Sequence, residues 1–171
     1  MSPTFTYKPL RSLPAVAALT LCAGMLAPLL GADNDLRIVP QVMVGTAGFE
    51  PGVALEWRAG DFERVVFRPE VFVNEDGRIG GGGAILYDLS PELNLPKDQA
   101  LSVGPRFVQH NADDTGWEFD GMLSYAISLS SNVKPWRHAV GALGALGVRQ
   151  DRERDQTGVG ASVGAFYSFR F

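Results

Sequence analysis

A long run of strict alternation between apolar and polar side chains constrains this chain most. Residues 116–130, GWEFDGMLSYAISLS, alternate along most of their length. A period of two is typical of a β-strand with one apolar and one polar face, and it recurs in residues 52–59 and 63–73. Strands in soluble proteins average about five or six residues, so the first run is long for a soluble sheet. The chain is therefore predicted to form long, two-faced strands.

Eight such segments follow one another, and each connector carries turn residues such as Gly, Pro, Asn and Asp. No helical pattern interrupts them, so the connections are predicted to be hairpins and the sheet an antiparallel meander. An eight-stranded meander closes as an up-and-down barrel, which is either soluble with an apolar interior or a membrane barrel with a polar one. The predicted strands are residues 36–46, 52–59, 63–73, 78–89, 99–110, 116–130, 137–150 and 157–171.

The amino-terminal segment differs from the rest. Lys8 and Arg11 precede residues 13–32, which carry no charge and end in a small residue. This pattern predicts a secretory signal peptide that is cleaved after Ala32, although the exact site stays open. A permanent membrane helix is the alternative, and Pro28 argues against it. The predicted division is a signal peptide, 1–32, and a barrel domain, 33–171.

Cysteine usage and charge exclude several functions. Cys22 is the one cysteine and lies in the predicted signal peptide, so neither a disulfide framework nor a cysteine metal site is expected. Without Lys8 and Arg11, 13 of the 15 basic residues remain against 19 acids, a net charge of −6 that argues against nucleic acid as a partner. After Ala32 the longest uncharged apolar stretch, 139–148, is far shorter than the roughly 20 residues of a membrane helix. We expect no metal and no cofactor.

The polar face of the predicted strands holds a balanced set of charges. Six are arginines and five are carboxylates, while the two lysines of the barrel domain, Lys97 and Lys134, lie in connectors. Arginine is suited to buried, bidentate pairing with carboxylates, and an unpaired buried charge costs several kcal/mol, roughly 3–5 when a partner is removed. The balance therefore favours a membrane barrel with a paired, narrow lumen. The predicted inward polar residues are Arg37, Gln41, Glu56, Arg58, Arg68, Glu70, Asp88, Arg106, His110, Glu118, Asp120, Arg149 and Arg170.

The opposite face is expected to contact lipid. It carries no charge in the predicted strands apart from His138, which is neutral or protonated and lies at a strand end. Aromatic residues should gather at the two membrane interfaces. If the barrel starts in the periplasm, they fall at two rims: Phe107, Trp117 and Phe119 at the outer one, and Trp57, Tyr87, Tyr167, Phe169 and Phe171 at the inner one.

The carboxyl-terminal end carries a recognisable motif. SVGAFYSF, residues 162–169, is followed by Arg170 and Phe171. It resembles the C-terminal signal of bacterial outer-membrane barrels, in which a polar residue, a glycine and two aromatics recur at fixed spacing. With the signal peptide and the alternating segments, the whole chain resembles small OmpX-like eight-stranded barrels. The resemblance implies an all-β transmembrane barrel that the barrel-assembly machinery recognises. The residues of this predicted assembly signal are Ser162, Gly164, Tyr167, Phe169 and Phe171.

Three prolines and two glycine runs need an explanation within this fold. Pro40, Pro69 and Pro105 lie inside predicted strands, although a closed barrel has no free edge for a missing N–H group. We expect bulges there, or strand limits that differ from those predicted. The glycines of residues 80–83 and 141–147 are expected to let a narrow barrel bend and to leave space for arginine side chains opposite.

Catalytic chemistry has one weak candidate, His110, near Asp113 and Asp114 at the outer end of its strand. Ser124, on the neighbouring strand, falls too far along the barrel to form a His/Ser pair. The acidic residues of the outer connectors, 74–76 and 151–155 among them, could bind Ca²⁺ and lipopolysaccharide phosphates, but solvated loops explain them as well.

The predicted function is structural, adhesive or surface-interacting, without enzymatic activity. The expected partners are outer-membrane lipids, lipopolysaccharide and the barrel-assembly machinery, and the expected state is a monomer in the outer membrane of a Gram-negative cell. Eight strands give an interior just wide enough for side chains, so an open, porin-like pore is not expected. The alternatives are an enzyme that modifies lipid A or phospholipid, a soluble periplasmic ligand-binding barrel and a narrow channel.

Overall fold

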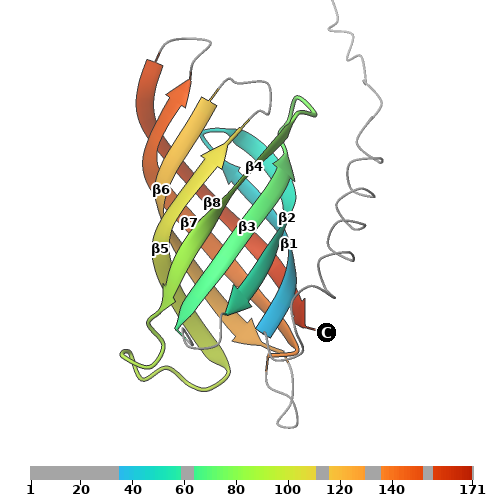
Figure 1. Ribbon diagram of the computed structural model, residues 1–171, viewed down its shortest axis with the longest axis vertical. Coiled ribbons are helices and arrows are strands. Elements are labelled where there is room, and N and C mark those ends of the chain that lie inside the picture. Colours follow the sequence, from blue (N-terminus) through green and yellow to red (C-terminus); the bar gives the residue numbers. More distant parts are fainter. Residues whose placement is uncertain (1–34, 59–63, 111–115, 130–135, 152–155, 171) are drawn as a thin grey trace, which may run out of the picture.

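Eight antiparallel strands form a closed barrel in the computed structural model (Figure 1), which describes residues 35–58, 64–110, 116–129, 136–151 and 156–170. Each strand pairs with its neighbours in the chain, and β8 pairs with β1 to close the barrel. The prediction of an eight-stranded antiparallel barrel is confirmed. The predicted signal peptide, 1–32, lies outside the described residues. The strands are β1 (Asp35–Gly45), β2 (Gly48–Arg58), β3 (Val65–Val73), β4 (Ile79–Asp88), β5 (Gln99–Gln109), β6 (Gly116–Ser128), β7 (His138–Asp151) and β8 (Gln156–Arg170).

The barrel has two ends that carry different connections. We name the end at which β1 begins and β8 finishes the terminal end, and the other the distal end. In Figure 1 the terminal end is the lower one, where the long β4–β5 connection lies. The β1–β2, β3–β4, β5–β6 and β7–β8 connections lie at the distal end. The described part of the chain contains no helix with the length and hydropathy needed to cross a membrane.

The first hairpin is tighter than predicted. Residues 47–51 were expected to connect two strands, but β2 already begins at Gly48, which pairs with Gly45 across a two-residue turn. Gly48 has a φ of 96°, a left-handed conformation that glycine adopts without strain. Pro51 and Gly52 indicated a turn in the sequence, yet both lie within the strand. The longer strand brings Glu50 into the barrel wall.

The three strand prolines each interrupt one ladder without shifting it. Pro40 lies where the β1–β8 pairing is interrupted, between Ile38 and Gln41. Pro69 and Pro105 lie in similar gaps of the β2–β3 and β4–β5 ladders. The register is the same on both sides of each gap, so neither predicted explanation, a bulge or an earlier strand end, is correct. Proline has no backbone N–H group. In an antiparallel strand each N–H group points to only one of the two neighbouring strands, so the pairing with the other neighbour stays intact.

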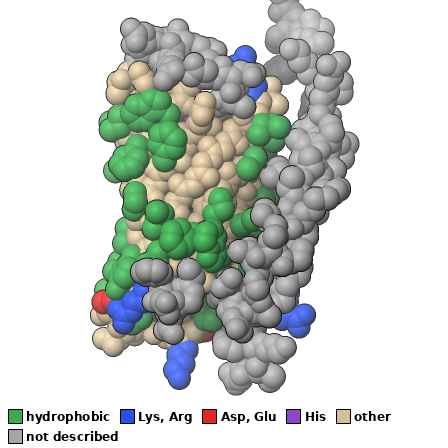
Figure 2. All heavy atoms as spheres, in the orientation of Figure 1, with side chains coloured by type: hydrophobic (Ala, Val, Ile, Leu, Met, Phe, Trp, Pro, Cys, Tyr) green, Lys and Arg blue, Asp and Glu red, His purple; other side chains and the backbone are tan. Residues whose placement is uncertain are grey.

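The two faces of the wall differ sharply in chemistry. Among strand residues whose side chains the structure describes, no Asp, Glu, Lys or Arg points outward, and large apolar residues such as Val163 and Leu146 are 68% and 62% exposed. Figure 2 shows hydrophobic side chains spread over the strands on one face, with Lys and Arg side chains only near the two ends. The polar residues of the same strands point into the lumen, where Arg68 and Glu70 are almost fully buried.

Apolar side chains fill the lumen between the charged ones, and glycines make room for the largest. A Cβ atom at Gly80 would collide with the ring of Phe72, and one at Gly141 would collide with the ring of Phe166. The prediction that these glycine runs leave space for arginine side chains is therefore wrong at both positions, because aromatic rings occupy the space. The buried hydrophobic cluster consists of Val39, Met43, Ala54, Val66, Ala84, Leu86, Met122, Leu143 and Phe166.

Candidate functional site

A chain of charged and amide side chains crosses the middle of the lumen. Arg68 on β3 donates to Glu56 on β2 and to Gln41 on β1. The amide of Gln41 in turn donates to Glu70, with Nε2 2.7 Å from Oε2. Side chains on a strand alternate between its two faces, and all of these residues occupy positions whose side chains point inward. Three strands are thus connected through the interior as well as through their backbone ladders.

Arg106 on β5 extends this chain to the far wall. Its Nε lies 2.5 Å from Oε1 of Glu70, and its Nη1 lies 3.0 Å from Oδ2 of Asp120 on β6. The side chains of all three residues are at most 2% exposed. Removing one member of such a group would leave an uncompensated buried charge. The network therefore ties β5 and β6 to β1, β2 and β3 and fills the cross-section of the lumen.

A second cluster closes the distal end. His110, one residue beyond the end of β5, lies between Glu50 and Glu118, with Nδ1 2.7 Å from Glu50 Oε1 and Nε2 2.9 Å from Glu118 Oε2. Burial opposes the charged ring, but hydrogen bonds to Glu118 and Glu50 outweigh burial and raise the pKa of His110 above its ordinary value. The doubly protonated imidazolium donates to both carboxylates, so it is the form that satisfies this geometry.

The surroundings of His110 are those of a buried structural group. The residue is 6% exposed, its ring packs against Phe72 at a centroid distance of 5.7 Å, and its backbone N–H donates to Gly116. Ser124 lies opposite Ser102 near the terminal end, on the other side of the Arg106–Asp120 level. Asp113 and Asp114, which the sequence places near His110, lie outside the described residues. The absence of enzymatic activity, with His110 as the one weak catalytic candidate, stays a prediction.

The terminal end gathers the remaining predicted lumen arginines. Arg58 donates to Asp88 over 3.1 Å, and the guanidinium of Arg37 lies 5.5 Å from the ring centroid of Trp136, a cation–π distance. Arg170 is the final residue of β8 and also lies at this end. Arg149 is the exception, because it lies opposite Glu118 near the distal end of β7.

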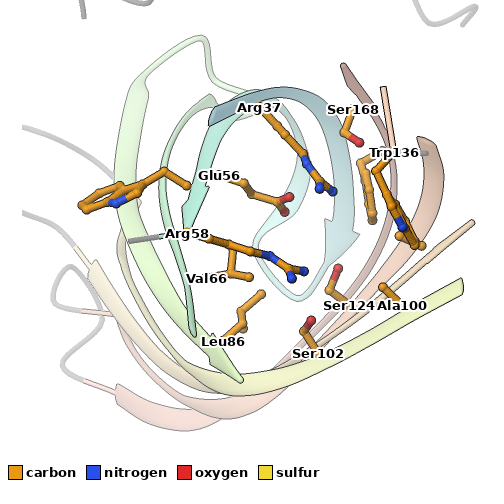
Figure 3. Close-up of a pocket in the computed structure, with 13 residues that line it drawn as sticks. Arg37, Glu56, Arg58, Val66, Leu86, Ala100, Ser102, Ser124, Trp136 and Ser168 are labelled. Atoms are coloured by element: carbon orange, nitrogen blue, oxygen red, sulfur yellow. The ribbon is translucent and has the colours of Figure 1, made fainter. Parts of the chain in front are cut away.

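A small cavity with a mixed polar and apolar lining lies inside the terminal half of the lumen. It encloses about 30 Å³, enough for one or two water molecules. Figure 3 shows Arg37 and Arg58 extending into this cavity from one side of the barrel, with Ser102 and Ser124 on another wall. Glu56 and Ser168 complete the polar lining, and Ser168 is 2% exposed.

The predicted assembly-signal residues lie on both faces of β8. Ser162 and Gly164 belong to the inward set, and the hydroxyl of Ser162 is buried. Tyr167 is outward, and its hydroxyl lies 2.6 Å from Nδ1 of His138. Phe169 packs beside Tyr167 with ring centroids 6.3 Å apart. Phe171 lies outside the described residues.

Sequence reasoning missed several residues of the lumen. Glu50 was assigned to a connector, although continuing the alternation back from Glu56 through Ala54 would have placed it on the inward face. The buried serines at positions 102, 124 and 168 alternate correctly but carry no charge, so they gave no separate signal. The position of Trp136 over the terminal end had no signal in the sequence, because it depends on a turn between two strands.

The described residues contain no group of three or more His, Cys, Asp or Glu side chains arranged to hold a metal ion. No protein-family model matches the chain, and the searches of curated proteins and of solved structures give no match either.

Proposed function

We propose that this protein is an integral outer-membrane β-barrel whose lumen is closed by its own side chains, with a structural or surface-interaction role. The observation that carries the proposal is the distribution of charge: the described outward strand positions have none, while the lumen is rich in arginines and carboxylates. An outward Arg or Lys would cost about 2–4 kcal/mol at the middle of a bilayer, whereas the same side chain on a surface exposed to water would carry no such penalty.

Strand length and aromatic positions support the same proposal. The strands have 9 to 15 residues, and a tilted membrane strand needs about 9–11. Near the distal end, Phe107 and Trp117 stack with centroids 6.4 Å apart, and near the terminal end Trp57 and Phe67 stack at 4.8 Å. Paired aromatic bands are a feature of membrane barrels. The C-terminal motif and the predicted signal peptide imply export and assembly, with lipids and lipopolysaccharide as the surroundings of the barrel.

The filled lumen favours a closed barrel over a channel. Arg68, Glu70 and Arg106 cross its middle, and the cavity beside them in the terminal half holds only about 30 Å³. We expect no stepwise conductance when the purified protein is added to a planar bilayer. Regular unitary steps would contradict the closed lumen but not the membrane location.

Fractionation of expressing Gram-negative cells tests the location. We expect the processed chain in the sarkosyl-insoluble fraction, with a gel mobility that changes on heating. Leu123→Arg places a charge midway along the outward face of β6, and we expect it to reduce the assembled fraction severely. Gln99→Arg places the same charge outward at the terminal end of β5, where about 0–1 kcal/mol is expected, and serves as the control. Recovery of the processed chain from detergent-free periplasmic extract would overturn the proposal.

Activity on lipid is tested separately through His110. The His110→Asn variant is expected to leave the lipid A composition of expressing cells unchanged, because both ring nitrogens of His110 are occupied by carboxylates. A difference in lipid A between wild type and His110→Asn would instead favour a lipid-modifying enzyme.

A further inference from the structure

The terminal end of the barrel opens into a second, larger cavity. It measures about 560 Å³ and is covered on one side by the β4–β5 connection. We name it the terminal mouth; its charged and aromatic lining consists of Arg37, Arg58, Asp88, Lys97, Trp136 and Arg170. Arg37, Arg58 and Trp136 also line the small cavity above it. The two cavities thus meet at the same two guanidinium groups.

The lining of the terminal mouth is strongly basic. Among the described residues, its lining has four basic side chains and one carboxylate, Asp88, which pairs with Arg58. A second carboxylate, Glu56, lines the adjoining small cavity and accepts from Arg68. The described lumen at the distal end is balanced by comparison, because the carboxylates Glu50 and Glu118 lie there with His110 and Arg149. An excess of basic side chains at the terminal mouth would attract anions to it.

Trp136 is fixed over the mouth at a cost in backbone energy. Its φ is +70°, a left-handed conformation that is unfavourable for a bulky side chain. Its backbone N–H donates to Ser128 Oγ over 3.0 Å, and its indole N–H donates to the carbonyl of Lys97 over 3.1 Å. Strained residues that are held by several contacts cluster at ligand sites. The indole joins the β6–β7 and β4–β5 connections and holds its ring against Arg37.

The β4–β5 connection is itself preorganised. The N–H groups of Leu93, Leu95 and Gln99 donate to the carbonyls of Leu89, Ser90 and Pro96. The connection therefore brings Lys97 to the mouth on a folded segment, so a ligand would lose little free energy in ordering it.

We propose that the terminal mouth is a binding site for a phosphate group, carried either by a small soluble molecule or by a lipid headgroup. Two guanidinium groups from adjacent strands present forked donors that match phosphate oxygens, and the buried serine hydroxyls behind them supply further donors. The volume exceeds that of a bare phosphate, so it leaves room for an additional polar group such as glycerol. The site goes beyond the proposed structural role and does not depend on where the barrel is located.

The fluorescence of Trp136 reports binding directly. The chain has three tryptophans, so the double variant Trp57→Phe/Trp117→Phe leaves Trp136 as the single emitter. The full-length protein in dodecyl maltoside, a detergent without phosphate, is titrated with inorganic phosphate, glycerol 3-phosphate and dihexanoyl phosphatidylglycerol. We expect a saturable change in emission that weakens as salt is added. No saturable change with any of the three would overturn the proposal.

Variants that each remove one positive charge distinguish binding at the terminal mouth from binding elsewhere on the surface. Arg37→Gln and Arg58→Gln are each expected to weaken binding about tenfold or more. Lys97→Gln, in the connection and outside the strands, is expected to weaken binding without affecting assembly, and it gives a result even if the arginine variants fail to fold. Arg78→Gln, in the β3–β4 connection at the distal end, removes the same charge and should leave binding unchanged. Equal weakening by Arg78→Gln and Lys97→Gln would contradict a site at the mouth.

The three ligands distinguish the sources of the phosphate. If the lipid binds at least tenfold more tightly than glycerol 3-phosphate, the ligand is a headgroup in the membrane. Equal affinity identifies a soluble phosphate compound. Both outcomes support the site, because both require the Arg37 and Arg58 side chains.

Discussion

Arg106 and Asp120 lie directly opposite each other on the adjacent strands β5 and β6, and the guanidinium donates to the carboxylate inside the lumen. Both side chains are buried, and Glu70 occupies the other side of Arg106. On the outer surface of the same strands, one residue further along, Phe107 and Phe119 form the opposite pair and are about half exposed. A single step along the ladder thus exchanges a buried ion pair for an exposed apolar pair.

Replacing Arg106 should destabilise the barrel strongly. Arg106→Met leaves Glu70 and Asp120 without their shared donor, which is expected to cost about 3–5 kcal/mol in the free energy of unfolding. Urea unfolding of the protein in phosphatidylcholine vesicles measures this. Arg64→Met breaks the exposed Arg64–Glu92 pair and should leave stability unchanged within error. Equal stability of the two variants would contradict the role given to the lumen network.

The cluster around His110 should make stability depend on pH. The raised pKa of His110 means that its contribution is fully present below the ordinary histidine value of about 6.5 and is lost as the pH rises through the folded-state value. The free energy of unfolding, measured between about pH 5 and pH 9, should therefore fall over this range. In His110→Gln the fall should be markedly smaller; an unchanged profile would exclude His110 as its source.

Two glycines on β7 should respond oppositely to the same substitution. A Cβ at Gly141 would meet the carbonyl of Tyr125 and the ring of Phe166, so Gly141→Ala is expected to cost about 1–3 kcal/mol. A Cβ at Gly144 meets nothing within 4 Å, and Gly144→Ala should be close to neutral or slightly stabilising. Unfolding midpoints of both variants test this. If Gly144→Ala were the more damaging, the assignment of faces on β7 would be wrong.

Deleting Phe171 should lower the yield of assembled barrel. The deletion removes the last aromatic residue of the motif that resembles an outer-membrane assembly signal. The measurement is the fraction of heat-modifiable protein in the membrane of expressing cells. Phe171→Tyr keeps an aromatic ring and should assemble like the wild type. Unchanged yield and mobility after the deletion would count against an assembly signal.

The fold was predictable because several long segments alternate with a period of two and turn residues separate all eight segments. Seven of the eight predicted strands begin within two residues of the observed ones, and β2 is the exception because Pro51 indicated a turn. The period of the sequence could not show that a closed barrel accommodates an outward proline, at which the backbone pairing with one neighbouring strand is interrupted. That result depends on the direction of a single N–H group.

The lumen was predictable as a set of inward residues but not as a set of pairs. Charge balance indicated that Arg68 and Glu70 point inward, yet the contact between Arg68 and Gln41 depends on the stagger of β1 against β3. The cluster of Glu50 with His110 joins residues 60 positions apart and required the tight first hairpin. Long-range register, rather than local pattern, decides which side chains meet.

Spin-label accessibility tests most directly the claim that the apolar face contacts lipid. Single cysteines at Leu146 and Val163, in a Cys22→Ser background, carry nitroxide labels on the outward face, and a cysteine at Glu75 carries one on the exposed β3–β4 connection. In phosphatidylcholine vesicles we predict that oxygen relaxes the labels at 146 and 163 more than an aqueous nickel complex does, with the reverse at 75. Access of the nickel complex to 146 and 163 equal to that at 75 would contradict the account.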